Sequence, residues 1–538
     1  MPKKPIRSNE VKKAGRPLGL DYLALRRLSL GYGPSDREHF EKLGPTLKKK
    51  YDQFIDQQLN PDSIKDQDCD ERINKQSLTC LAKKPEELWK EHHLKPTELK
   101  EKIEKSMDGA MKSGDQNMTL NDINKLKTQP AREIESMTWL RAVYSKRQLF
   151  EIMVGFWHDH FSVYAFDENI SPGFVSFDRD VIRKHALGNF RDLLGAVAQS
   201  PAMIFYLDNF VNQSGNANEN YARELLELHT LGAENYLGTM PRTAVRGYSK
   251  KSPAGYVDGD VYEAARCFTG WRVNTGKDSK EDGSFLYYEP WHDRFQKIVL
   301  GHPISEYQKP MKDGHDVLDI LCSHQGTANF LAKKLCFRFY GANPPPALVD
   351  KTARAFKKNA KSPRQIALTI QALVSAKEFT ETSQKKFLRP FEFTASILRG
   401  LSAEFTPSEN FINLTAKTGQ RLFNWRTPDG YPDHAEKWDN TGSVIETWRL
   451  CHQMLLGKIE GIKVPEPPRS SGLNPESLVA SWYQNFIGTT LIESELSAVT
   501  SFLAQGRNPQ SPIPEELFKT RYPSALALVL MTPSVRWA

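Results

Sequence analysis

The run Asn-Glu-Asn-Tyr-Ala-Arg-Glu-Leu-Leu-Glu-Leu-His-Thr-Leu-Gly at residues 218–232 decides the fold class of this chain. Its apolar residues recur at the three- and four-residue spacing of an α-helix, and we expect a helix over 220–231. At about 100° per residue, His229 falls in the middle of the apolar arc, whereas Glu224 falls at its border. The run therefore predicts a buried histidine with a carboxylate at the edge of the same helix.

A histidine in a core has two interpretations. Burying an unpaired polar ring costs about 1–3 kcal/mol, so His229 should be hydrogen-bonded or liganded. The first interpretation makes it a structural core residue, and the second makes it a metal ligand or a proton-transfer group.

Helical spacing continues on both sides of this run and predicts a mainly α, large multi-helix globular assembly. Near 283–300 the pattern alternates instead, which predicts a small β-hairpin. We divide the chain into a disordered basic arm at 1–16, an N-terminal helical region with a polar lysine-rich segment at 17–130, a helical core at 131–405 and a C-terminal helical region packed on the core at 406–538.

The run Phe-Trp-His-Asp-His-Phe at residues 156–161 contains two further candidates. Residues two apart on a helix point to roughly opposite faces, so His158 and His160 cannot share one ion there. Either the helix ends near Trp157 and an extended backbone turns both rings to one face, or only one ring serves a site. We favour the second alternative, with His160 inward and His158 on the polar edge beside Glu151 and Ser162.

Polar residues at loop ends complete the candidate set. His292 and Asp293 follow the predicted first hairpin strand, and Asp260 opens a predicted helix. The alternative interpretation is a hydrogen-bonded turn for His292 and Asp293 and a favourable interaction with the helix dipole for Asp260. Imidazoles with carboxylates suit a divalent transition metal. We expect Glu224 and Asp293 as catalytic residues, and as metal ligands His160, His229, His292 and Asp260, with His158 as an alternative ligand.

Composition limits the partners. The net charge of +8 is spread over 73 basic and 65 acidic residues, so nucleic-acid binding is not expected. We find no apolar stretch of membrane-spanning length and no secretory signal. This predicts a cytoplasmic protein, or an exported one if Met1 replaces a removed signal or if a partner carries the chain.

These motifs resemble the bacterial family catalogued as domain of unknown function 1800. The runs that carry the resemblance are Arg27–Pro34, Phe54–Leu59, Phe156–Phe161, Lys184–Leu207, Asn218–Gly232, Asp260–Trp271 with Phe-Thr-Gly-Trp at its end, His292–Gly301, His315–Phe339, Lys386–Leu401 and Gly430–Pro432. The resemblance implies a protein partner similar to the sulfatase and alkaline phosphatase superfamily, and export of many members. This chain departs from the family pattern by an insertion at 237–254, by Val257 in place of threonine and by Tyr431 in place of tryptophan.

Two functions fit the sequence. The first is a metal- or cofactor-dependent enzyme, a hydrolase or an oxidoreductase, with a histidine and carboxylate site. The alternative is a non-catalytic scaffold or cell-surface assembly protein that works with the sulfatase- or phosphatase-like partner.

Overall fold

The structure is a computed structural model that describes residues 17–107, 119–276, 281–383, 386–466, 474–487 and 492–538. The predicted basic arm, residues 1–16, lies outside these described residues.

Helices dominate the fold, as the sequence predicts. In the first half they are α1 (Leu20–Tyr22), α2 (Pro34–Glu41), α3 (Leu47–Gln58), α4 (Gln67–Asn74), α5 (Pro85–Trp89), α6 (Lys95–Met107), α7 (Leu120–Tyr144), α8 (Gln148–His160), α9 (Ser171–Ser176), α10 (Phe190–Ala198), α11 (Pro201–Tyr206), α12 (Asn220–Glu224) and α13 (Asp258–Cys267). In the second half they are α14 (Lys312–Ser323), α15 (Gln325–Tyr340), α16 (Pro346–Lys358), α17 (Gln365–Val374), α18 (Lys377–Thr380), α19 (Pro390–Gly400), α20 (Glu409–Lys417), α21 (Thr441–Leu455), α22 (Pro475–Phe486), α23 (Glu493–Ala504), α24 (Glu515–Leu530) and α25 (Pro533–Arg536).

The strands form three short antiparallel pairs, and the mainly α class with small hairpins is confirmed. The pairs are β1 (Trp271–Val273) with β2 (Phe285–Tyr287), β3 (Lys297–Val299) with β4 (His302–Ile304), and β5 (Glu404–Phe405) with β6 (Ile462–Lys463). The segments around Phe285–Tyr288 and Ile298–Leu300, which suggested the hairpin near 283–300, do not pair with each other but belong to two separate hairpins, β1–β2 and β3–β4. Leu300 and Gly301 both have positive φ, so a two-residue turn folds β3 back onto β4 instead.

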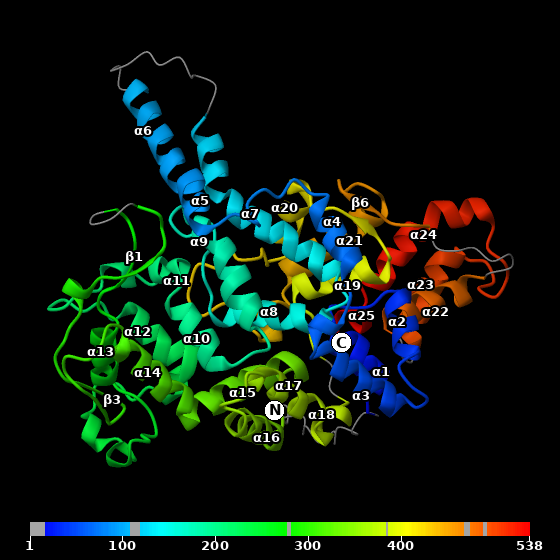
Figure 1. The fold of residues 1–538 in the computed structure, drawn as a ribbon. Coiled ribbons are helices and arrows are strands. Elements are labelled where there is room, and N and C mark those ends of the chain that lie inside the picture. The colour runs from blue at the N-terminus through cyan, green and yellow to red at the C-terminus, as the bar shows by residue number, and fades with distance from the viewer. Residues whose placement is uncertain (1–16, 108–118, 277–280, 384–385, 467–473, 488–491) are drawn as a thin grey trace, which may run out of the picture.

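One connected cluster of buried hydrophobic residues runs from Tyr22 to Ala538. The two ends of the described chain meet, because Arg26 Nη2 donates to Val535 O at 2.8 Å and Arg27 Nη2 donates to Ala538 O at 2.8 Å. In Figure 1, α1–α3 accordingly lie near α25, whereas α6 and the start of α7 project from the body. The long-range contacts make the N- and C-terminal segments parts of one packed body.

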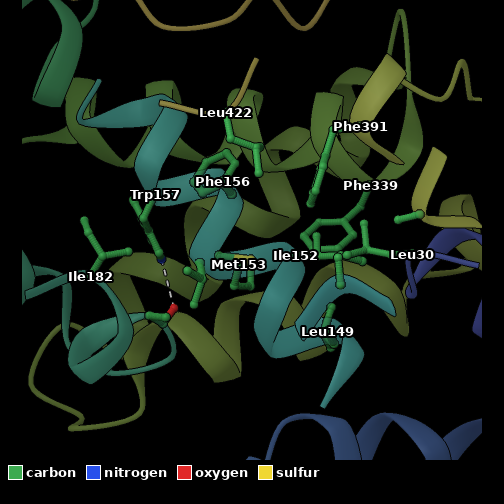
Figure 2. Packing of buried hydrophobic residues seen from close by; sticks show 14 of the residues in the cluster. Leu30, Leu149, Ile152, Met153, Phe156, Trp157, Ile182, Phe339, Phe391 and Leu422 are labelled. Carbon is green, nitrogen blue, oxygen red and sulfur yellow. Dashed lines mark hydrogen bonds between the residues drawn. The ribbon is translucent and has the colours of Figure 1, made fainter. Parts of the chain in front are cut away.

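Helix α8 crosses this core and positions the site residues. Figure 2 shows its apolar face, with Leu149, Ile152, Met153 and Phe156 packed among side chains from other elements. Trp157 anchors the last turn, since its Nε1 donates to Ala186 O at 2.9 Å. The helix continues to His160, so its backbone does not become extended at Trp157.

Four segments adopt the wider π-helical turn, in which the backbone hydrogen bond spans five residues instead of four. They are Leu23–Arg27, Lys90–Leu94, Phe177–Arg183 and Leu225–Thr230. Residues five apart then come closer to one face than in an α-helix. Asp178 and Arg183 illustrate the effect, with Oδ2 and Nε 2.9 Å apart. The run that decided the fold class thus changes from an α-helix to a π-helix after Glu224.

Across the described residues, no helix has the length and apolar character that a membrane crossing requires.

Candidate histidine and carboxylate site

The structure brings two of the predicted ligands together. The ring centroids of His160 and His229 lie 6.3 Å apart, and His160 Nε2 lies 3.1 Å from His229 O, to which it donates. The residues are 1% and 0% exposed, so the prediction that both point inward is confirmed. His160 Nδ1 and both ring nitrogens of His229 have no hydrogen-bond partner among the described residues.

Burial keeps these two imidazoles neutral. Burial lowers the pKa of His229 to about 3, and the nearby Lys334 lowers it further. The same two causes, in the same order, hold the pKa of His160 well below its ordinary value. Burial also lowers the pKa of Lys334 itself, against the opposing charges of Asp433 and Asp159. The pair therefore lies in an apolar environment beside a lysine.

The other predicted ligands lie among different neighbours. His292 Nδ1 donates to Thr269 O at 2.9 Å, and its Nε2 is 3.3 Å from Asp313. Asp293 forms a two-point ion pair with Arg266, at 2.8 and 3.0 Å. These are the contacts of an ordered turn, which was the alternative interpretation of His292 and Asp293.

Asp260 accepts backbone N–H groups, from Val257 at 3.2 Å and from Leu300 at 2.9 Å. It therefore joins the start of α13 to the β3–β4 turn and caps the helix through Val257 N, a contact that the sequence analysis did not predict for Asp260. Among the described residues, no three histidine, cysteine or acidic side chains gather closely enough to hold a metal ion. The four-residue metal set is thus dispersed in this structure.

His158 belongs to a buried ion-pair network that the sequence did not predict. Its Nε2 lies 2.9 Å from Asp178 Oδ1, and Asp178 Oδ2 accepts from Arg183 Nε at 2.9 Å. Arg183 Nη1 in turn donates to both carboxylate oxygens of Glu151 at 3.0 Å. Burial raises the pKa of Asp178, but Arg183 and His158 outweigh burial and bring it to about 2. Asp178 is therefore ionised next to the imidazole.

This network borders a cavity of about 40 Å³. Glu151, His158 and Ser162 all line it, so the polar edge on which the helical wheel grouped them faces an internal space. His158 is 8% exposed, and its Nε2 is the ring nitrogen that Asp178 binds. One ring nitrogen is thus fixed by a carboxylate, while the ring itself borders the cavity.

Two arginines line the same cavity. Arg389 Nη1 donates to Asp159 Oδ2 at 2.7 Å, and Arg338 Nη1 lies 3.0 Å from Glu392 Oε1. Each guanidinium uses Nη1 for its carboxylate, and Nε of each has no partner among the described residues. The cavity therefore combines the ring of His158, which Asp178 binds, with cationic groups on largely apolar walls.

A loop from the C-terminal region closes this cavity. Trp425 and Tyr431 contribute lining side chains, and Gly430 lies so close to α8 that an added Cβ would be 2.0 Å from Asp159 O. Gly430 also has φ +73°, a conformation that favours glycine. Tyr431, which departs from the family pattern, thus lies at the site, whereas the insertion at 237–254 contributes no lining residue to this cavity.

Glu224 lies five residues before His229 at the start of the π-helical segment Leu225–Thr230. Burial raises its pKa to about 7, with a further contribution from Glu227 and from Asp429 of the closing loop. A carboxyl group with such a pKa exchanges protons near neutral pH. Its partial exposure keeps it in contact with solvent.

Sequence reasoning missed Asp178, Arg183, Arg338 and Arg389. The first two lie in a π-helical segment, whose five-residue pairing a 100° wheel does not represent. Arg338 and Arg389 lie within the runs His315–Phe339 and Lys386–Leu401 that carry the family resemblance. Charged residues inside otherwise apolar helices were the available signal, because such residues are rarely buried without a partner.

Fold and site together define a helical protein with a buried histidine–aspartate pair beside a small cavity. The family model described as protein of unknown function (DUF1800) matches residues 23–537, and the chain belongs to this family. Neither the curated proteins nor the solved structures contain a match.

Proposed function

We propose that the protein is a hydrolase in which His158, held by Asp178, transfers protons at the cavity lined by Arg338 and Arg389. The observation that carries this proposal is the hydrogen bond between the buried imidazole and the ionised carboxylate at the cavity wall. An aspartate in this position orients the ring and stabilises the imidazolium that forms during proton transfer.

In the proposed reaction, His158 Nδ1 takes a proton from a water molecule in the cavity, and the oxygen of that water attacks the scissile bond. The bond to the leaving group breaks, and the imidazolium returns the proton to it. Arg338 and Arg389 stabilise the negative charge that develops on the attacked group. A cavity of about 40 Å³ has room for a water molecule, so the substrate presents its bond at the cavity mouth.

A divalent transition metal at the His160–His229 pair is the second candidate, favoured by the unpartnered ring nitrogens. Metal-bound histidines commonly donate their other N–H to a backbone carbonyl, as His160 does to His229. The charge of Lys334 opposes a cation there, so we rank this candidate second. Stoichiometric metal in tag-free protein, lost in His229→Ala, would favour it over the first.

Hydrolysis of p-nitrophenyl acetate, phosphate and sulfate by purified protein tests the first candidate. We expect turnover of at least one ester, and a loss of about 10²–10⁴-fold in His158→Gln because general acid–base catalysis contributes that factor. Asp178→Asn should lose rate in the same direction, with circular dichroism confirming that each variant is folded.

His92→Gln is the matched control. Like His158, His92 is a buried histidine, and it is 2% exposed. It lies in the π-helical segment Lys90–Leu94, and its Nδ1 donates to Leu126 O at 2.8 Å. His92 does not line the cavity. Its rate should equal that of the wild type. No turnover of any of the three esters, or equal losses in His92→Gln and His158→Gln, would reject the proposal.

A further inference from the structure

A second cavity, of about 490 Å³, lies between α2, α3 and the N-terminal end of α8. Its volume falls within the roughly 300–1,000 Å³ that small-molecule sites occupy. Gln148 separates it from the smaller cavity, because its Oε1 accepts from Leu30 N at 2.9 Å and Leu30 lines the smaller cavity. The second cavity is therefore distinct from the proposed catalytic cavity.

The charged groups around this cavity leave an excess of positive charge. Asp36 is neutralised by Arg399, whose Nη2 donates to its Oδ2 at 2.8 Å. Lys65 and Lys146 also line the cavity, and neither forms an ion pair with any residue that the structure describes. Two lysines without an ion-pair partner among the described residues thus line the space, and the lining includes no unpaired carboxylate.

A buried carboxylate brings these two lysines to one side. Asp66, which follows Lys65, accepts from Ser145 Oγ at 2.6 Å and from Lys146 N at 2.8 Å. The residue is 4% exposed, so these bonds lie in a protected environment. The segments that carry Lys65 and Lys146 are therefore fixed side by side, although they lie far apart in the sequence.

The rest of the cavity lining consists of both polar and apolar side chains. His39 Nε2 lies 3.0 Å from Gln57 Oε1, which leaves the amide N–H groups of Gln57 free to donate. Leu25, Phe54 and Ile64 supply an apolar wall. A ligand that fits both parts carries a negative charge and an apolar body.

We propose that this cavity binds a small organic anion, with its charged group at Lys65 and Lys146 and its apolar body against Leu25 and Phe54. Ammonium groups bind carboxylates, sulfonates and phosphates alike, so the charge and the apolar body define the ligand class. The site is independent of the chemistry at His158.

The fluorescent probe 8-anilinonaphthalene-1-sulfonate, which has an aromatic body and one negative charge, tests this assignment. Titration into the full chain should give saturable one-site binding, at least 10-fold weaker in Lys65→Glu/Lys146→Glu. Both lysines are exposed and form no ion pair with a described residue, so charge reversal should leave the melting temperature unchanged. Gln57→Trp, which fills the cavity, should also weaken binding at least 10-fold.

Lys358→Glu/Lys361→Glu is the matched charge control, because both lysines are exposed and lie outside the cavity lining. It should bind the probe as the wild type does. Equal affinities of wild type and Lys65→Glu/Lys146→Glu, or equal weakening in the control pair, would overturn the proposal. A neutral analogue, N-phenyl-1-naphthylamine, should bind at least 10-fold more weakly than the sulfonate, and equal binding would refute the anionic class.

Discussion

His158 and His160 lie two residues apart on α8, and both are buried against aromatic rings, yet their polar partners differ. His158 meets the ionised carboxylate of Asp178 and a cavity. His160 meets the backbone carbonyl of His229, aromatic rings such as Phe156 and a nearby lysine charge. Burial alone therefore does not distinguish the two histidines, whereas their polar partners do.

The difference has an electrostatic origin. A carboxylate beside an imidazole stabilises the charged ring, which a proton-transfer residue must form at each turnover. An apolar shell with a neighbouring ammonium group opposes that form, as the lowered pKa of His229 illustrates. We therefore expect substitutions around His158 to lower the unfolding free energy by breaking ion pairs. We expect a substitution of His229 to alter how stability falls at acidic pH.

The largest expected effect comes from removing the carboxylate of the first environment. Asp178→Ala leaves Arg183 with Glu151 alone and His158 without its acceptor, so we expect unfolding free energy to fall by about 3–5 kcal/mol. Urea unfolding followed by circular dichroism measures the change.

Asp180→Ala provides the comparison within the same π-helical segment. Asp180 pairs with Arg179 at 2.7 Å, but its side chain is 51% exposed. Such surface pairs contribute about 0–1 kcal/mol. Equal losses of unfolding free energy in Asp178→Ala and Asp180→Ala would contradict the view that a stabilising buried ion-pair network distinguishes His158 from His160.

The helical body and the inward direction of His160 and His229 were predictable, because apolar spacing directly records which face of a helix is buried. The wheel also grouped Glu151, His158 and Ser162. It did not show what lies opposite this polar edge, because a local pattern does not reveal that another segment, with its own charges, covers that face.

The partners of these residues were not predictable by local rules. Asp178 reaches His158 through tertiary packing, and its pairing with Arg183 depends on a π-helical turn that has no simple sequence signature. His292 and Asp260 failed to join the histidine pair because turn and cap hydrogen bonds already use their polar atoms. Loop-end residues meet at a site only where the tertiary fold brings their loops together.

The apolar environment of His229 should make the stability of the protein depend on pH in the acidic range. The pKa of His229 is about 3 in the folded protein and about 6.5 when unfolded, so the unfolded chain takes up the proton first. Stability from this ring is present above pH 6.5 and is lost as the pH falls towards 3. Between pH 7 and pH 5 the wild type should lose about 2 kcal/mol more than His229→Leu, measured by urea unfolding at both pH values.

Leucine at this position removes the two unpartnered nitrogens and keeps the apolar volume, so the variant remains folded. His39→Leu, at an exposed histidine bonded to Gln57, is the matched control and should keep the acid loss of the wild type. If His229→Leu loses as much stability between pH 7 and pH 5 as the wild type does, protonation of His229 is not the cause of the acid loss.

The smallest expected effect concerns Glu224, one π-helical turn before His229. Here stability is lost as the pH rises, whereas for His229 it is lost as the pH falls. Burial, with Glu227 and Asp429, raises the folded pKa of Glu224 to about 7, above an unfolded value of about 4.5. Its contribution to stability is therefore present below pH 4.5 and is lost as the pH rises through 7. Because the side chain is partly solvated, screening reduces the effect to about 1 kcal/mol.

Between pH 5 and pH 8, Glu224→Gln should therefore lose about 1 kcal/mol less stability than the wild type, again by urea unfolding. Glu227→Gln sharpens the test, because removing one neighbouring charge should move the midpoint of the Glu224 effect to lower pH while leaving the effect itself in place. If Glu224→Gln and the wild type lose stability equally between these pH values, the carboxyl group is ionised throughout. Glu224 would then resemble a surface glutamate.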